Sequence, residues 1–187
     1  MYQTSDIKNG LKVEIDGQPY IVTYFQFVKP GKGQAFTRTK LKNMLNGNVL
    51  DRTFKSGETL EPADITEGAH QYMYNDGESF HFMNLETFDQ IEMPPEAVGD
   101  AKNFLVEEMQ VDVMFYKARP VSVALPNFVE LAIEYCEPGV KGNTAQGATK
   151  PATLTTGYSV NVPLFIEQGE VLKVDTRTGE YSSRVKS

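Results

Sequence analysis

The chain has 187 residues, of which 40% are hydrophobic and 23% are charged, a composition typical of a globular protein. No apolar run approaches the roughly 18 residues that a membrane-spanning helix needs. The first ten residues lack the basic start and the apolar stretch of a cleaved leader. The single cysteine, Cys136, cannot form an internal disulfide, which agrees with a reducing compartment. We therefore expect an uncleaved cytoplasmic protein without a membrane segment.

The net charge of −7 is distributed unevenly along the chain. Residues 1–57 contain nine basic and four acidic side chains, whereas residues 65–127 contain three basic and eleven acidic ones. The overall charge argues against a nucleic-acid partner, but a polyanion is attracted by the local potential and not by the average. The N-terminal part is therefore the candidate surface for a nucleic acid.

The N-terminal part has the pattern of short strands joined by tight turns. Apolar positions alternate on both sides of Asp16-Gly17, a dipeptide that readily adopts the positive φ angles of a two-residue hairpin turn. Asn46-Gly47 offers a second turn of this kind. With the strands on either side of residues 29–35, four or five short strands are expected, and they predict a small closed barrel.

The remainder of the chain repeats this style with one exception. A helix is expected near residues 95–108, because Pro94 and Pro95 suit a helix start. Strands are expected on both sides of a turn at residues 75–77, within residues 111–126, and within residues 128–135, 153–166, 170–176 and 181–185, with a last turn at residues 175–179. Because charge and turn spacing change near residues 64 and 127, we expect an all-β protein of three small barrels, at residues 1–64, 65–127 and 128–187.

The segment "KPGKGQAF", residues 29–36, places Lys32 between two glycines at the tip of a predicted hairpin. A phosphate-binding P-loop needs Ser or Thr after its Gly-Lys and then a helix, whereas Gln34 and a predicted strand follow here. A solvated lysine at an exposed turn is the simplest alternative, and the sequence pattern alone leaves it open.

The predicted strand after this loop carries a row of cations. Alternation of period two places Phe36, Arg38, Lys40 and Lys42 on one face and Thr37, Thr39 and Leu41 on the other. With Lys29 and Lys32 at the loop, the cations form a basic stripe suited to phosphate contacts that position a nucleic acid without reading its sequence. An ordinary solvent-facing strand has the same appearance, so this alternative also stays open.

Four motifs, in order along the chain, resemble those of bacterial elongation factor P. They are "FVKPGKGQAF", "YMYNDGESFHFMN", "KPATLTTGYSVNVPLFIEQGE" and "VDTRTGEYSSRV". The resemblance extends over essentially the whole chain. It implies a KOW or SH3-like barrel followed by two OB-folds, in an L-shaped arrangement similar to a tRNA.

The resemblance also implies a function. Members of that family bind the ribosome between the peptidyl and exit sites, beside peptidyl-tRNA, and relieve stalling at consecutive prolines. We accordingly expect a monomer that contacts both ribosomal subunits, is not an enzyme and needs no cofactor. Lys32 matches the lysine that one branch of the family extends with β-lysine, which implies a modifying ligase resembling lysyl-tRNA synthetase. The expected tRNA or rRNA contacts are Lys29, Pro30, Gly31, Gly33, Arg38, Lys40 and Lys42.

One position departs from the family pattern. Asn143 lies between Gly142 and Thr144, where the family usually has aspartate. The resemblance places this loop near the exit-site mRNA and the small subunit. Asparagine keeps the size and hydrogen-bonding capacity of aspartate but loses its charge. A Gly-rich connector without a contact is the alternative reading.

Other chemistry has little support in the sequence. His70 and His81 flank a predicted turn and could meet Cys136 only by an accident of folding, so neither a metal site nor a thiol-catalytic site is expected. No catalytic constellation is apparent. A general single-strand RNA-binding or chaperone protein that uses its OB-folds is the alternative function.

Overall fold

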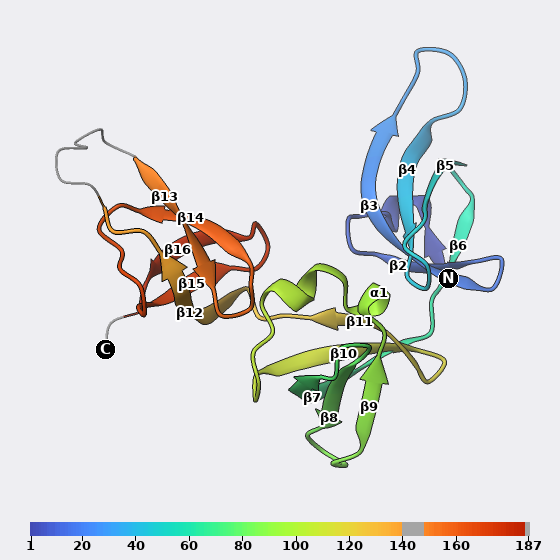
Figure 1. Cartoon of the computed structure of the whole chain (residues 1–187). Helices are drawn as coiled ribbons and strands as arrows, with labels where there is room; N and C mark the ends of the chain where they lie inside the picture. Colours follow the sequence, from blue (N-terminus) through green and yellow to red (C-terminus); the bar gives the residue numbers. More distant parts are fainter. Residues whose placement is uncertain (140–147, 186–187) are drawn as a thin grey trace.

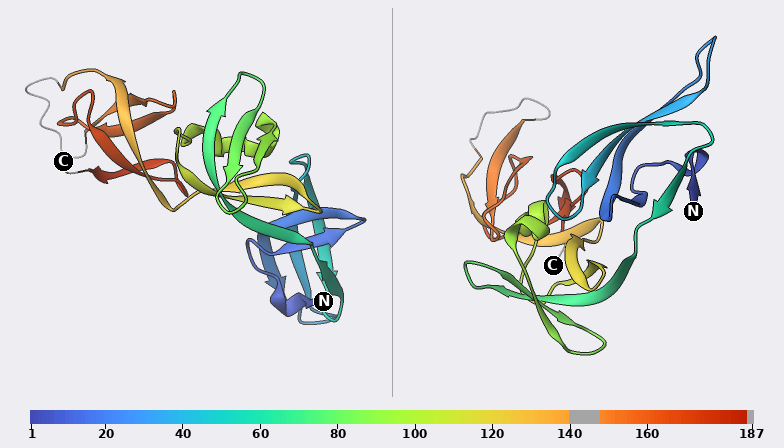
Figure 2. Two further views of the ribbon diagram at one scale, coloured as in Figure 1. Left: turned by 90° about the horizontal axis from the view of Figure 1, so that it is seen from below. Right: turned by 90° about the vertical axis from the view of Figure 1, so that its right-hand side faces the viewer.

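The computed structural model describes residues 1–139 and 148–185 and is an all-β protein with three antiparallel sheets. The N-terminal sheet contains β1–β6, the central sheet β7–β11 and the C-terminal sheet β12–β16. The sheets follow one another around a bend, with the central sheet at the corner (Figure 1). The two other views show the same order (Figure 2). The predicted fold class is confirmed.

The N-terminal sheet has the strand order β1-β6-β2-β3-β4-β5. Its elements are β1 (Tyr2–Gln3), the 3-10 helix η1 (Thr4–Asp6), β2 (Lys12–Ile15), β3 (Gln18–Val28), β4 (Phe36–Asn43), β5 (Val49–Lys55) and β6 (Thr59–Pro62). Its core contains Val13, Val22, Leu41 and Phe54. The predicted turn between β2 and β3 is confirmed, because Asp16 and Gly17 both have positive φ and Ile15 pairs with Gln18.

The central sheet has the strand order β11-β10-β7-β8-β9. Its elements are β7 (Ile65–Asn75), β8 (Phe80–Asn84), β9 (Gln90–Met93), α1 (Pro95–Val98), the 3-10 helix η2 (Gly99–Asn103), β10 (Gln110–Tyr116) and β11 (Arg119–Ala124). Phe82, Met93 and Val113 are fully buried in its core.

The helix expected near residues 95–108 is wrong in length. Helix α1 covers only Pro95–Val98, and η2 continues to Asn103. Gly99 has a φ of 59°, which ends the α-helix. Farther along, Phe104 belongs to the core of the C-terminal sheet and Leu105 to the core of the central sheet, so this segment connects two cores. An amphipathic helix would direct its apolar side to one core only.

The C-terminal sheet has the strand order β14-β13-β12-β15-β16. Its strands are β12 (Phe128–Cys136), β13 (Thr149–Leu154), β14 (Ser159–Pro163), β15 (Val171–Asp175) and β16 (Glu180–Arg184). Gly179 has a φ of 78° and donates its N–H to the Asp175 carbonyl, so the predicted last turn is confirmed. No helix in the described part of the chain is long and apolar enough to cross a membrane.

Candidate functional site: the β3–β4 hairpin

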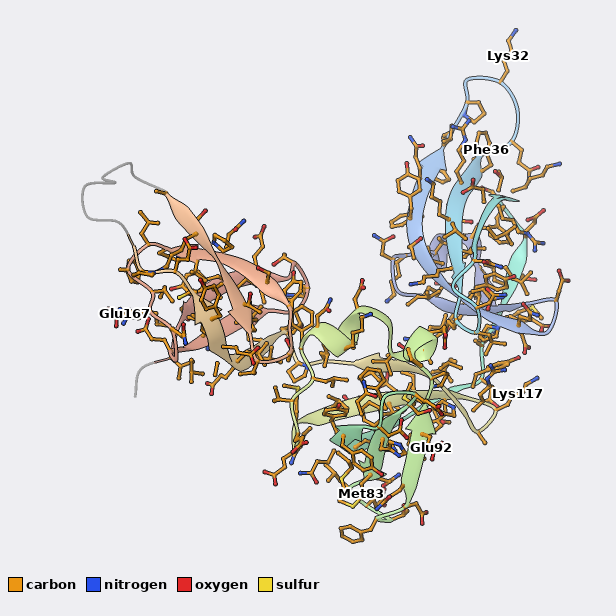
Figure 3. All side chains as sticks on the ribbon, viewed as in Figure 1. Lys32, Phe36, Met83, Glu92, Lys117 and Glu167 are labelled. Atoms are coloured by element: carbon orange, nitrogen blue, oxygen red, sulfur yellow. The ribbon has the colours of Figure 1, made fainter. Side chains whose placement is uncertain are left out.

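The β3–β4 hairpin projects beyond the barrel that carries it. The two strands pair from Tyr20↔Asn43 to Val28↔Phe36, and the loop of residues 29–35 joins them. Its far end lies away from the other two sheets (Figure 1). Lys32 is at this end, and its side chain points outward (Figure 3). The hairpin therefore presents one amine at a distance from the body of the molecule.

The loop is anchored on one side only. The side chain of Gln34 donates to the Ser56 carbonyl at 2.6 Å, and the Ser56 N–H donates to the Ala35 carbonyl at 3.0 Å. Gln34 thus fastens the loop to the β5–β6 turn. Lys32 itself is exposed and forms no ion pair with any described residue.

The glycines beside Lys32 have different local roles. Gly33 has a φ of 100°, which an L side chain rarely adopts, so the turn requires glycine there. Gly31 has an ordinary φ, and a Cβ added to it would meet nothing within 4 Å. The described fold therefore does not require glycine at position 31.

The basic face predicted for β4 is present. Arg38, Lys40 and Lys42 are exposed and alternate with Thr37, Thr39 and Leu41, which are buried. The guanidinium of Arg38 lies 5.5 Å from the centre of the Phe36 ring. Among the described residues, none of the three cations is in an ion pair. Asp51 pairs with Lys40 across the strands and is the one acidic partner in this register. These cations are available to phosphate groups.

The exposed aromatic residues of β3 are a feature of the hairpin that the sequence pattern did not predict. Tyr24 is 46% exposed, Phe25 41% and Phe27 59%. Tyr24 pairs with Lys40 and therefore lies on the basic face, where its ring can stack on a base or a ribose. The length of the apolar and aromatic segment "YIVTYFQFV" could have indicated their exposure. A strand that extends beyond its barrel exposes side chains on both of its faces.

The remaining candidates do not form a second site. The loop containing Gly142, Asn143 and Thr144 lies outside the described residues. Cys136 is buried in the C-terminal core. In the described part of the chain, no group of three His, Cys, Asp or Glu residues could hold a metal ion.

His81, on β8, bonds the turn that precedes this strand. Its Nε2 lies 2.8 Å from Oδ2 of Asp76, and its ring stacks on Tyr74 with 4.4 Å between the ring centres. The hydrogen bond from His81, with backbone N–H bonds from Ser79 and Glu78, lowers the pKa of Asp76 to about 2. This carboxylate holds the β7–β8 turn together.

Comparison with known proteins defines the class of this protein. Three family models match the chain: an elongation factor P KOW-like domain at residues 3–60, an elongation factor P OB domain at residues 65–123, and an elongation factor P C-terminal domain at residues 129–184. An all-β chain that combines these domains with a lysine-tipped hairpin is a translation factor.

Full-length relatives define the family. The chain is 51% identical over 186 residues to "Elongation factor P 2" of Geobacter sulfurreducens, and 47% identical over 186 residues to elongation factor P of Syntrophus aciditrophicus. Both alignments cover 100% of this chain and 100% of the relative. The chain belongs to the elongation factor P family of translation elongation factors.

A solved structure supports the fold at greater evolutionary distance. Eukaryotic translation initiation factor 5A from Methanococcus jannaschii aligns with a TM-score of 0.52 and 21% identity, over 64% of this chain and 88% of that one. At this identity the likeness concerns the fold alone.

Proposed function

We propose that the chain binds the ribosome between the peptidyl and exit sites, beside peptidyl-tRNA, and stimulates peptide-bond formation at consecutive prolines. It acts as a cytoplasmic monomer and contacts both subunits, the small subunit through the loop of Gly142, Asn143 and Thr144. The observation that carries the proposal is the position of Lys32, which is exposed at the end of a projecting hairpin without an ion-pair partner among the described residues.

Lys32 is the attachment point for a β-lysyl group in this proposal. A bare lysine offers one hydrated ammonium on a flexible stem. A β-lysyl group on Nζ would lengthen the reach and add an amide and a second amine, both able to bond RNA farther along. A ligase resembling lysyl-tRNA synthetase would supply it, and the exposed tip leaves Nζ accessible to that enzyme.

The rest of the hairpin holds the RNA. Lys29, Arg38, Lys40 and Lys42 bind phosphates of tRNA or rRNA through charge, which positions the factor without reading a sequence. Pro30 restricts the loop before binding and so lowers the entropy lost when the loop becomes ordered. Gly31 and Gly33 allow RNA to approach the backbone closely, in agreement with the open space around both positions.

The rate enhancement comes from placement. Proline reacts poorly as donor and acceptor in peptide transfer, and the cost of orienting two reactants can amount to several kcal/mol. A factor that holds the acceptor end of peptidyl-tRNA in a reactive geometry lowers this cost. No side chain of the chain needs to exchange a proton with the substrates, so the factor acts without being an enzyme.

The test compares variants in a reconstituted translation assay on a template with a proline run. Lys32→Arg keeps the charge but cannot accept a β-lysyl group, so we expect it to retain ribosome affinity and lose most of the stimulation at saturating factor. Lys40→Ala and Lys42→Ala, tested in the modified form, should weaken binding, each lowering the salt dependence by about one phosphate contact. They should approach the wild-type rate at saturation.

Two controls define the outcomes. Unmodified wild type should behave as Lys32→Arg does. Lys8→Ala removes an exposed positive charge outside the basic face and should leave both affinity and rate unchanged. If Lys32→Arg matched the modified wild type at saturation, the extension hypothesis would fail, and Lys32 would be one more cation of the hairpin.

A further inference from the structure

Two tight turns meet where the N-terminal sheet touches the central sheet. One is the Asp16-Gly17 turn between β2 and β3, and the other is the Lys117-Ala118 turn between β10 and β11. Tyr116, the last residue of β10, is 6% exposed. Its hydroxyl donates to the carboxylate of Glu14 on β2 and lies 3.1 Å from the Gly17 carbonyl oxygen. The Tyr116 hydroxyl of the central sheet thus contacts the β2–β3 turn of the N-terminal sheet.

Lys117 completes a cluster of three side chains at this junction. Its Nζ lies 3.5 Å from Oε1 of Glu14 and 5.1 Å from the centre of the Tyr116 ring. Figure 3 shows Lys117 on the side of the central sheet that lies next to the N-terminal sheet. Glu14, Tyr116 and Lys117 together are called the junction cluster below.

The backbone of the Lys117-Ala118 turn is in an unfavourable conformation. The φ angles are 48° at Lys117 and 67° at Ala118, whereas Asn-Gly is the sequence that such turns prefer. L residues other than Asn and Asp seldom occupy this region. A turn that persists with disfavoured residues is fixed by its surroundings, and the surroundings here include the Glu14 carboxylate.

Few polar contacts join the N-terminal and central sheets in the described part of the chain. Within residues 1–139 and 148–185, the junction cluster supplies every side-chain hydrogen bond and ion pair between the N-terminal and central sheets. The chain crosses between them at residues 63–64, where the Ala63 N–H donates to the Lys12 carbonyl at 3.2 Å. A cleft of about 530 Å³ lies between the residue 43–47 loop of the N-terminal sheet and α1 and β11 of the central sheet.

We propose that Glu14 and Tyr116, supported by Lys117, are positioning residues: they fix the angle at which the N-terminal sheet carries Lys32 relative to the rest of the molecule. The inference rests on the proposed function, in which Lys32 must reach the acceptor end of peptidyl-tRNA while the other sheets are bound elsewhere. Because Lys32 lies at the far end of the hairpin, a small rotation at the junction becomes a larger displacement at the tip (Figure 1). Misplacement by about 1 Å can cost large factors in rate.

The first test measures the geometry directly in the full-length protein. Spin labels on Glu58→Cys and Glu86→Cys, in a Cys136→Ser background, report the distance between the N-terminal and central sheets, because both positions are exposed. We expect one narrow distance distribution in this background and a broader one when Tyr116→Phe or Glu14→Gln is added. Tyr158→Phe is the matched control, since it removes a hydroxyl that bonds the Gly179 carbonyl at 3.0 Å within the C-terminal sheet. It should leave the distribution narrow.

The second test separates positioning from binding. The same variants without labels, with equal modification of Lys32 verified by mass, are compared on a proline-run template. For Tyr116→Phe and Glu14→Gln we expect the saturating rate to fall by roughly 3- to 10-fold, with a smaller change in the factor concentration that gives half the maximal effect. Tyr158→Phe should match wild type in both quantities.

The outcomes distinguish the inference from the proposed function. Unchanged distance distributions in Tyr116→Phe and Glu14→Gln overturn the inference, and so do broadened distributions with a wild-type saturating rate. A modified wild type that gives no stimulation overturns the proposed function and the positioning role together. Failure of the positioning role alone is recognised by an active wild type whose junction variants are equally active.

Discussion

The two junctions between the three sheets are built from different interactions. The N-terminal and central sheets meet through the polar junction cluster, with the Tyr116 hydroxyl bound to the Glu14 carboxylate. The central and C-terminal sheets meet through apolar packing, in which Phe104 enters the C-terminal core and its ring lies 5.2 Å from that of Tyr158. Met109 and Leu125 pack against both the central core and the C-terminal core.

The second junction is also hydrogen-bonded along its rim. The Thr156 hydroxyl donates to the Asn103 carbonyl at 2.6 Å, and the Thr176 hydroxyl to the Pro126 carbonyl at 2.6 Å. Shared apolar burial couples neighbouring units strongly, whereas a few polar contacts orient them without merging their cores. We therefore expect the central and C-terminal sheets to behave as one body and the N-terminal sheet to be a separately oriented arm that carries Lys32.

The largest effect is expected from removing the ring of Phe104, which the segment after η2 places in the C-terminal core. Phe104→Ala should destabilise the central and C-terminal sheets together by about 3–5 kcal/mol, because it leaves a cavity in the C-terminal core at the point where the segment from the central sheet packs into it. Hydrogen exchange resolved by peptide should show faster exchange in both sheets and unchanged exchange in the N-terminal sheet.

The matched control for this change is Phe88→Ala. Phe88 is 69% exposed on the central sheet, so the same truncation should alter stability by no more than about 0.5 kcal/mol. Faster exchange confined to the C-terminal sheet of Phe104→Ala would mean that the two sheets are independent after all.

A smaller effect is expected from pH, at the polar junction only. The hydrogen bond from Tyr116, and next among the favourable causes the charge of Lys117, hold the pKa of Glu14 below its usual value. A carboxylate with a lowered pKa contributes fully above the ordinary glutamate pKa of roughly 4.3 and loses its contribution as the pH falls through the lowered value. The contact between the N-terminal and central sheets should therefore weaken when the pH falls below the ordinary glutamate pKa and through the lowered pKa of Glu14.

At alkaline pH the contribution of Tyr116 is lost as the pH rises. The hydrogen bond to Glu14, and then burial, raise the pKa of Tyr116, so its contribution is complete below the ordinary tyrosine pKa of about 10 and is lost as the pH rises through the raised value. The distribution of spin-label distances between the N-terminal and central sheets should stay narrow from about pH 5 to about pH 9. It should broaden at lower and at higher pH. If the width of this distribution does not change at alkaline pH in Tyr116→Phe, the tyrosine is confirmed as the source of the alkaline broadening. The same alkaline broadening in that variant would refute this assignment.

Local chemistry explains which features the sequence could predict. The positive φ of Asp16-Gly17 and the alternation of Arg38 and Lys40 with buried Thr39 follow from neighbouring residues, and both were confirmed. The sequence also predicted that Lys32 would lie at a loop tip, because glycines flank it.

Features that depend on distant residues could not be read in this way. Tyr116 and Glu14 are 102 positions apart, and nothing near either residue indicates the other. The helix expected to reach residue 108 ends at Val98, because Gly99 has a φ of 59°. The segment beyond it places Phe104 and Leu105 in different cores, which is a tertiary effect that outweighs local propensity. The exposure of Tyr24 likewise depends on how far β3 extends past its barrel.

The most direct test of the account is the mass of the peptide that contains Lys32, measured in the protein purified from its own cells. We expect a peptide heavier than its sequence by one β-lysyl group, attached to Nζ of Lys32. A peptide of unmodified mass, from protein that fully stimulates translation through consecutive prolines, would contradict it.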